Sequence, residues 1–193
     1  MKAARIVVLD RDGVINVDVP GKYVCSPEDW IPIEGSLAAM ARLTQAGFDI
    51  YVVSNQSGIG RGLFTVDALQ AMHRKFLDAL SAHGGQLAGW FYCPHTPADG
   101  CACRKPRTGL LDQVRDAAGR SLHRVPFIGD KTTDLQAARS CRMRGMLVGT
   151  GHGREALLCE PASVSEYFDD LPAAVSALID GAVGEPEEGV GER

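Results

Sequence analysis

Two aspartates one residue apart, Asp10 and Asp12, directly follow the short apolar run 6–9 and precede Gly13. A continuous apolar run of this length is typical of a strand that is buried on both faces. Two carboxylates at the end of such a strand repel each other and lose hydration, unless a cation or a reacting group lies between them. The pattern indicates metal-dependent chemistry, with an ordinary Asp-rich turn as the alternative.

Polar residues also follow two other apolar runs. The run 49–53 is followed by Ser54, Asn55, Gln56 and Ser57, and the run 125–128 is followed by Gly129, Asp130 and Lys131. Ligand sites of parallel α/β sheets lie beyond the carboxyl ends of the strands. We therefore expect these polar residues to meet the first two aspartates in one cleft.

The elements that position these residues alternate between strands and helices, which predicts an α/β fold, a three-layer Rossmann-like parallel sheet. Expected strands cover 6–9, 49–53, 87–93, 125–128, 145–148 and 164–168, and expected helices cover 36–46, 65–82, 109–119, 132–142 and 171–179. Thr65 is expected to cap one helix, and Thr132 or Thr133 another. A loop or small hairpin at 14–30 and a flexible glycine loop at 58–62 complete the cleft. The connections leave too little chain for a cap domain.

The three aspartates that gather in the cleft are a donor set for a hard cation. Asp10, Asp12 and Asp130 supply carboxylate oxygens in an open site, which suits Mg²⁺. Asp134 lies one helical turn beyond Asp130 and has two readings, a neighbour of the metal or a first-turn residue that stabilises the helix dipole. The sequence leaves its role open.

Hydrogen-bond donors and cations accompany these acids. Ser54 and Asn55 can donate to phosphate oxygens, Lys105 and Lys131 add positive charge, and Arg104 offers a planar pair of donors. A magnesium ion surrounded by such groups is the equipment that phosphoryl transfer requires. The composition of the cleft therefore favours an enzyme that acts on phosphate esters.

A second metal site is indicated by the spacing C-x-H-x5-C-x-C, which comprises Cys93, His95, Cys101 and Cys103. Three thiolates and one imidazole form a closed tetrahedral set of the kind that holds structural Zn²⁺, and a disulfide is the alternative. Arg104 and Lys105 follow the last ligand directly. We expect zinc to order this loop without taking part in catalysis. The remaining cysteines, Cys25, Cys141 and Cys159, are expected to be unpaired.

Length and charge set the broad class. The chain has 193 residues and a net charge of −4, which predicts one domain over 1–180 and gives no electrostatic case for nucleic acid. No apolar run reaches the roughly 20 residues of a membrane span. The first five residues lack the features of a signal peptide, so we expect a cytoplasmic monomer with no membrane partner. The Gly- and Glu-rich segment 181–193 is expected to be disordered.

Four motifs in order resemble those of the haloacid-dehalogenase-like (HAD) phosphatases: residues 10–13, Ser54–Asn55, Lys105, and Gly129–Asp130 followed by Asp134. The resemblance covers the chain to about residue 179. It implies that Asp10 is a nucleophile that forms an aspartyl-phosphate, and that Asp12 is the general acid and then the general base. It further implies Mg²⁺ held by Asp10, the backbone carbonyl of Asp12, and Asp130. Ser54 and Lys105 would stabilise the phosphoryl oxygens.

Within this family, the stretch 54–62 and the zinc loop followed by Arg104, Lys105 and Pro106 resemble the heptose bisphosphate phosphatases of ADP-heptose synthesis for lipopolysaccharide. The resemblance implies removal of the C7 phosphate of a heptose 1,7-bisphosphate. It also implies substrate contacts from a set of cleft residues, namely Asp18, Tyr23, Asn55, Gln56, Ser57, Arg104 and Lys131. Arg104 suits the phosphate that is retained. The anomer of the sugar is left open.

Other functions fit the sequence less well. Histidinol-phosphate phosphatase has the same compact zinc loop, but a substrate with an amino group does not call for the cations Arg61, Arg104, Lys105 and Lys131. Another sugar-phosphate phosphatase is a further alternative. A receiver-type signalling domain also uses acids, a hydroxyl and a lysine, but its paired acids and its phosphate-accepting aspartate lie on different strands. The glycines at 58, 60 and 62 lack the G-x-G-x-x-G spacing of a dinucleotide site.

Overall fold

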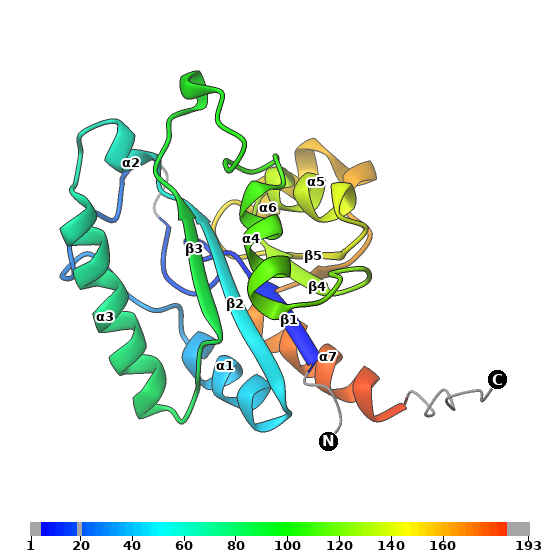
Figure 1. Ribbon diagram of the computed structural model, residues 1–193. Helices are drawn as coiled ribbons and strands as arrows, with labels where there is room; N and C mark the ends of the chain where they lie inside the picture. The colour runs from blue at the N-terminus through cyan, green and yellow to red at the C-terminus, as the bar shows by residue number, and fades with distance from the viewer. Residues whose placement is uncertain (1–4, 19–20, 185–193) are drawn as a thin grey trace.

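The structure is a computed structural model in which residues 5–18 and 21–184 are described. Six parallel strands form one sheet in the order β3-β2-β1-β4-β5-β6 (Figure 1). The strands are β1 (Arg5–Leu9), β2 (Phe48–Asn55), β3 (Gly89–Cys93), β4 (Pro126–Gly129), β5 (Arg144–Val148) and β6 (Tyr167–Phe168). The chain order reverses between β1 and β4, and it is at such a switch that the ligand crevice of an open sheet lies.

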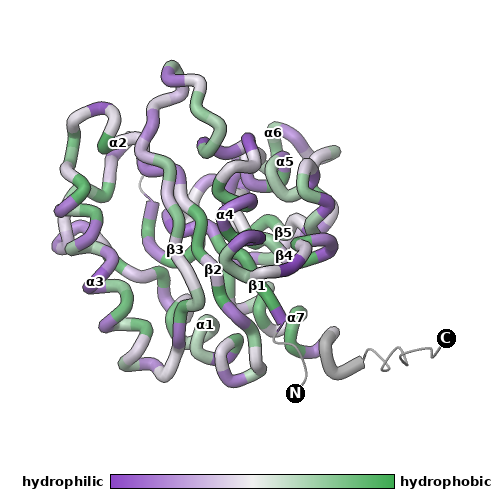
Figure 2. Tube along the Cα trace, viewed as in Figure 1, coloured by the Kyte–Doolittle hydropathy of each residue, from purple (hydrophilic) through white to green (hydrophobic). Residues whose placement is uncertain are grey.

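Helices cover both faces of the sheet, which gives the three expected layers. One face carries α1 (Ser36–Gln45), α3 (Val66–Ala82) and α7 (Leu171–Gly184), and the other carries α4 (Gly109–Ala118) and α5 (Thr132–Ser140). Alternate residues of the largely hydrophobic β1 serve the two cores (Figure 2). Val7 and Leu9 pack on the first face, and Ile6 and Val8 pack on the second. The predicted fold class is confirmed.

All the expected strands and helices are present, with ends shifted by a few residues. The cap at Thr65 is confirmed, because its side chain accepts a hydrogen bond from N of Ala68 at 3.1 Å. The cap expected at Thr132 or Thr133 is wrong. Helix α5 begins after Lys131, whose backbone N donates to Oδ2 of Asp134 at 3.1 Å. A carboxylate three residues into the helix thus replaces the hydroxyl.

The structure contains short helices that were not predicted from the sequence. The glycine segment that we expected to be a flexible loop contains α2 (Ser57–Gly60), and α6 (Gly153–Cys159) follows β5. The 3₁₀ turns η1 (Pro97–Asp99) and η2 (Pro161–Ser163) add to these. Helix α7 ends at Gly184 instead of residue 179, so the expected tail begins inside it, and residues 185–193 lie outside the described part. None of the described helices is both long and apolar enough to cross a membrane.

The segment after β1 forms a loop over the end of the strand, as expected. Val14 and Ile15 are fully buried, and Trp30 at its far end is 1% exposed. Isolated bridges join Asn16 to Asp12 and to Pro32. Lys75 of α3 donates to the carbonyls of Pro27 at 2.6 Å and Trp30 at 2.9 Å. Buried side chains at one end and a lysine at the other hold this loop against the body of the protein.

Candidate active site

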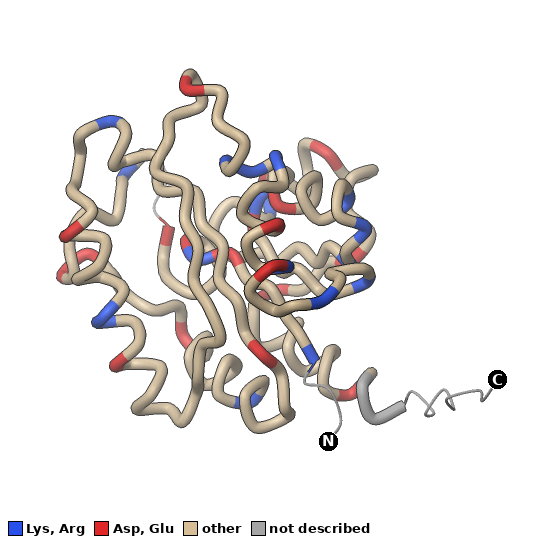
Figure 3. The backbone as a smooth tube through the Cα atoms, in the orientation of Figure 1, with Lys and Arg blue, Asp and Glu red and all other residues tan. Residues whose placement is uncertain are grey.

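A cavity of about 390 Å³ opens at the carboxyl ends of β1, β2 and β4. Acidic and basic segments adjoin each other in this part of the molecule (Figure 3). The cavity is lined by almost all the site residues that the sequence predicted, namely Asp10, Asp12, Asp18, Tyr23, Ser54, Asn55, Gln56, Ser57, Arg104, Lys105 and Lys131. Asp130 is the exception among the acids, because it is fully buried and does not line the cavity. Lys22, Thr133, Asp134 and His152 also line it.

Three buried carboxylates form a cluster at the end of the cavity. Oxygens of Asp10, Asp130 and Asp134 lie within 4.8 Å of one another. Burial raises the pKa of Asp10 to about 6, although Lys105 opposes the shift, and burial raises the pKa of Asp130 to about 8 against Lys131. Oδ1 of Asp130 accepts no hydrogen bond and lies 3.3 Å from Nζ of Lys131. A cluster in which two buried carboxylates have raised pKa values fits a divalent cation.

Two glycines make room for Asp130. Gly13 and Gly151 have φ of +85° and +56°, and a Cβ on either residue would collide with Oδ2 of Asp130. The loops that carry them are tied together, because Oγ1 of Thr150 donates to the carbonyl of Gly13 at 2.6 Å. Oδ2 of Asp130 in turn accepts a hydrogen bond from N of His152 at 2.9 Å. The glycine after Asp12 is thus required by the approach of a carboxylate from another strand.

Lys105 reaches the carboxylate cluster from the zinc loop. Its Nζ lies 2.9 Å from Oδ1 of Asp10 and 2.7 Å from Oδ1 of Asp134. Burial lowers the pKa of Lys105, but the two carboxylates outweigh this and the net shift is upward, so the lysine is charged. Oδ1 of Asn55 accepts a hydrogen bond from the backbone N of Lys105 at 3.0 Å, and Nδ2 of Asn55 donates to the backbone carbonyl of Lys105 at 3.1 Å. Asn55, predicted to bind substrate, is therefore seen positioning the lysine.

Asp12 points away from the cluster into a separate cradle. Its Oδ1 accepts from Nε and Nη2 of Arg11 at 3.0 and 2.8 Å and from Nδ2 of Asn16 at 2.9 Å. Burial raises the pKa of Asp12, but the charge of Arg11 and the hydrogen bonds from Asn16 and Gln56 lower it by more. The net shift is therefore downward. The sequence analysis missed Arg11 and Asn16. Their position beside the paired acids was the available signal.

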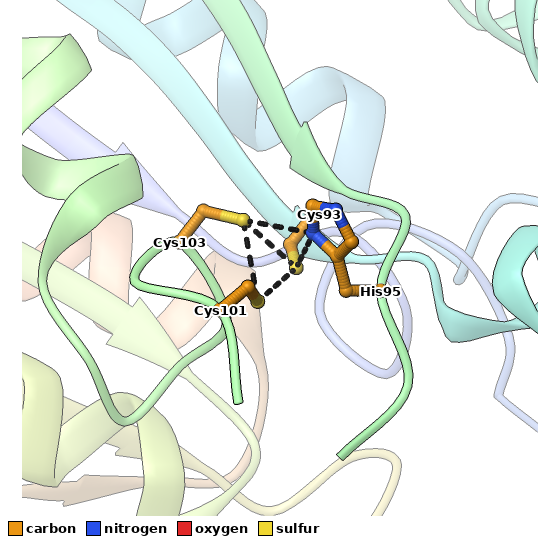
Figure 4. A group of neighbouring side chains, drawn as sticks. All are labelled: Cys93, His95, Cys101 and Cys103. Atoms are coloured by element: carbon orange, nitrogen blue, oxygen red, sulfur yellow. Dashed lines mark hydrogen bonds between the residues drawn. The ribbon is translucent and has the colours of Figure 1, made fainter. Parts of the chain in front are cut away.

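The zinc ligands that the sequence predicted lie together at the end of β3 and in the loop that follows it (Figure 4). Sγ of Cys93 is 3.1 Å from Sγ of Cys103 and 3.5 Å from Sγ of Cys101, and Nδ1 of His95 is 3.3 Å from Sγ of Cys103. All these cysteines are free, and their separations exceed the roughly 2.05 Å of a disulfide. The cluster fits a tetrahedral zinc site. The scattered cysteines are also unpaired, as expected.

The loop after β1 closes over the cavity through Asp18. Its Oδ2 lies 2.9 Å from Nζ of Lys131 and 3.5 Å from Nε2 of His152. Burial lowers the pKa of Lys131, but Asp130, Asp10 and Asp18 raise it by more, so the lysine is charged. His152, to which the sequence analysis gave no role, lines the cavity. Its glycine-rich surroundings carried no signal for this placement.

Comparisons with known proteins agree with this geometry. Residues 102–174 match a family model described as HAD-hydrolase-like. The D-glycero-beta-D-manno-heptose-1,7-bisphosphate 7-phosphatase of Pseudomonas aeruginosa is 43% identical over 174 residues, which cover 90% of this chain and 97% of that protein. The enzyme of the same name from Bordetella bronchiseptica is 44% identical over 179 residues, covering 91% of this chain and 98% of that protein.

A solved structure gives the same result. The crystal structure of D,D-heptose 1,7-bisphosphate phosphatase from B. bronchiseptica, complexed with magnesium and phosphate, superposes with a TM-score of 0.88 at 42% identity. The match covers 92% of this chain and 99% of that one. The chain therefore belongs to the HAD-like phosphatase family that includes these heptose bisphosphate phosphatases.

Proposed function

We propose that this protein is a Mg²⁺-dependent phosphatase that removes the C7 phosphate of D-glycero-D-manno-heptose 1,7-bisphosphate through an aspartyl-phosphate on Asp10. The observation that carries the proposal is the buried group of Asp10, Asp130 and Lys105 beside a cavity that Arg104 and Lys131 also line. Relatives that span nearly all of the chain are named for the beta anomer of this substrate. These names support the β anomer, which the sequence left open.

Asp10 is oriented for nucleophilic attack. Backbone N of Arg11 donates to its Oδ1 at 2.7 Å, and Nζ of Lys105 lies 2.9 Å from the same atom. Oδ2 is therefore the oxygen that attacks phosphorus. As the new P–O bond forms, the bond from phosphorus to the sugar oxygen breaks, and that oxygen takes a proton from Asp12. Water then attacks the aspartyl-phosphate and gives its proton to Asp12, which restores both residues.

Positive charge around the phosphoryl group stabilises the transition state. Bound Mg²⁺ would be held by Asp10, the backbone carbonyl of Asp12, and Asp130, and it would neutralise charge on the phosphoryl oxygens. Lys105 and the hydroxyl of Ser54 contact the same phosphoryl oxygens. Asp134 is 2.7 Å from Nζ of Lys105, so its role is to hold the lysine.

The mouth of the cavity suits a second phosphate. Arg104 and Lys131 both line the cavity, and so do Asp18 and Tyr23 of the loop after β1, which can contact the sugar hydroxyls. Arg104 presents a planar pair of donors to the retained C1 phosphate. Histidinol phosphate carries an ammonium group instead, which these cations would repel. The arrangement favours the bisphosphate over this alternative.

The cellular setting follows from the same features. We propose a cytoplasmic enzyme, because three reduced cysteines in a metal set are typical of a reducing compartment. The residues that line the cavity come from one chain, so a monomer has a complete site. The substrate is a free small molecule, and its product would feed ADP-heptose synthesis.

Steady-state kinetics with Mg²⁺ test the proposal. The panel consists of the α and β anomers of heptose 1,7-bisphosphate, heptose 7-phosphate, and histidinol phosphate. We expect the highest kcat/KM for the β bisphosphate, and a raised KM for heptose 7-phosphate because it lacks the phosphate that Arg104 binds. A preference for histidinol phosphate would contradict the substrate assignment. Loss of phosphate release after chelation of Mg²⁺, with recovery when the ion is restored, tests the cofactor.

A further inference from the structure

The amide of Gln56 joins two groups that the proposed mechanism uses separately. Its Nε2 donates to Oδ2 of Asp12 at 2.7 Å and to Oγ of Ser54 at 2.6 Å. Its Oε1 accepts from Nη2 of Arg11 at 3.1 Å, and this contact fixes which end of the amide carries the nitrogen. Gln56 is only 4% exposed, so water competes little for these hydrogen bonds.

The contact with Gln56 sets the direction of the Ser54 hydroxyl. Oγ of Ser54 is the acceptor in this hydrogen bond, so its own proton is free to be donated elsewhere. Ser54 lines the cavity in which the phosphoryl group is proposed to bind. A hydroxyl held in this way donates to an anionic oxygen, which is the interaction that the phosphoryl group needs.

The contact with Gln56 also sets the orientation of the Asp12 carboxyl. A carboxylate offers about four lone-pair positions. In Asp12 these positions are filled by Nε and Nη2 of Arg11, Nδ2 of Asn16 and Nε2 of Gln56. The nitrogen of Gln56 that donates to Oδ2 of Asp12 also donates to Ser54, so one side chain holds both groups.

We propose that Gln56 is a positioning residue that couples the phosphoryl-binding hydroxyl of Ser54 to the proton-carrying carboxyl of Asp12. This inference rests on the proposed function. Through one amide, Gln56 holds the carboxyl of Asp12 in the orientation from which its proton passes to the sugar oxygen as the P–O bond breaks. The same amide keeps the hydroxyl of Ser54 directed toward the phosphoryl group.

The test compares two kinds of leaving group in the first turnover. Release of a sugar alkoxide from heptose 1,7-bisphosphate needs a proton, whereas p-nitrophenyl phosphate releases a stable phenolate that does not. For Gln56→Leu we expect the rate of first-turnover release to fall about 10²-fold for the heptose and at least tenfold less for the aryl ester. Gln70→Leu is the matched control, because Gln70 is exposed on α3. We expect wild-type rates for this control.

Each outcome separates the inference from the proposed function. An equal loss on both substrates, or no loss on either, would overturn the role of Gln56. If the wild-type protein releases p-nitrophenol but does not act on the heptose, the proposed substrate is wrong. The Gln56 comparison is then made with an alkyl phosphate that the wild type does hydrolyse. Gln56→Met keeps the length of the side chain and replaces Gln56→Leu should that variant lose its zinc content or its circular dichroism spectrum.

Discussion

The two ligand clusters of this protein differ in every property that separates a catalytic metal site from a structural one. Asp10, Asp130 and Asp134 are no more than 4% exposed, and Asp10 and Asp134 line a cavity that admits a ligand. The thiol and imidazole groups lie on a loop, three of the four are partly exposed, and none lines that cavity. The first cluster offers carboxylate oxygens, which suit Mg²⁺, whereas the second is a complete tetrahedral set that suits Zn²⁺.

The clusters are nevertheless joined through a short stretch of backbone. Cys93 lies opposite Asn55 in the pairing of β2 with β3, and its carbonyl accepts from N of Gln56 at 2.7 Å. Arg104 and Lys105 continue directly from the last zinc ligand into the cavity. The connection leads to the prediction that zinc, without taking part in catalysis, determines where the proposed catalytic cation Lys105 lies. Changes to either cluster test this division of work.

The largest effect is expected at the carboxylate cluster. Asp10→Asn removes the nucleophile and should lower kcat by at least about 10⁴-fold, as measured by phosphate release. The fold should persist, because the substitution removes a charge that burial disfavours. Asp116→Asn, at an exposed position of α4, is the matched control. Near-normal turnover by the Asp10 variant would refute the aspartyl-phosphate.

The next effect is expected at the zinc cluster. Cys101→Ser, or removal of zinc by a chelator, should disorder the loop and displace Arg104 and Lys105, which lowers kcat and raises KM together. Zinc content, melting temperature and steady-state kinetics measure the result. Cys159→Ser provides the control, because that thiol is exposed and free. A zinc-free protein with full activity would show that the loop holds its cations without the metal.

The carboxylate cluster should also make the stability of the protein depend on pH. Folding raises the pKa of Asp10 from 3.8 to about 6 and that of Asp130 from 3.8 to about 8. Between these limits the folded state binds more protons than the unfolded state, so magnesium-free protein should lose stability as pH rises from about 4 to 8. Mg²⁺ binds the ionised carboxylates, so it should raise the melting temperature more at pH 8 than at pH 5. Equal shifts at both values would contradict a cation in this cluster.

The sequence predicted which residues lie in the candidate site, but it did not predict which of them hydrogen-bond to one another. Strand-end position brought Asp10, Asp12 and Asp130 to one edge of the sheet, because parallel strands share that edge. The zinc site could be predicted because its ligands are close together in the sequence. Pairings between distant loops carried no such signal, so the hydrogen bonds of the Asn55 and Gln56 amides to Lys105 and Asp12 were not predicted. The predicted contacts of these two residues with substrate stay predictions.

The short elements were missed for a related physical reason. Helix α6 begins at a glycine, and its seven residues are too few to show a helical period. Its placement is set by packing, since a Cβ on Gly153 would collide with the carbonyl of Val148. The approach of this helix brings His152 to the cavity. A residue that tertiary packing alone delivers to a site cannot be found from local sequence.

The smallest effect is expected at His152, which contacts neither metal cluster through its side chain. Its Nε2 is 3.5 Å from Asp18, and the ring is 30% exposed, so the contact stabilises the loop over the cavity only weakly. His152→Gln should raise KM for the bisphosphate by less than about fivefold and leave kcat unchanged, because the backbone N of residue 152 still donates to Asp130. His123→Gln, before β4 and outside the cavity lining, is the control. A fall in kcat for the His152 variant would instead place its imidazole in the proton transfers that are assigned to Asp12.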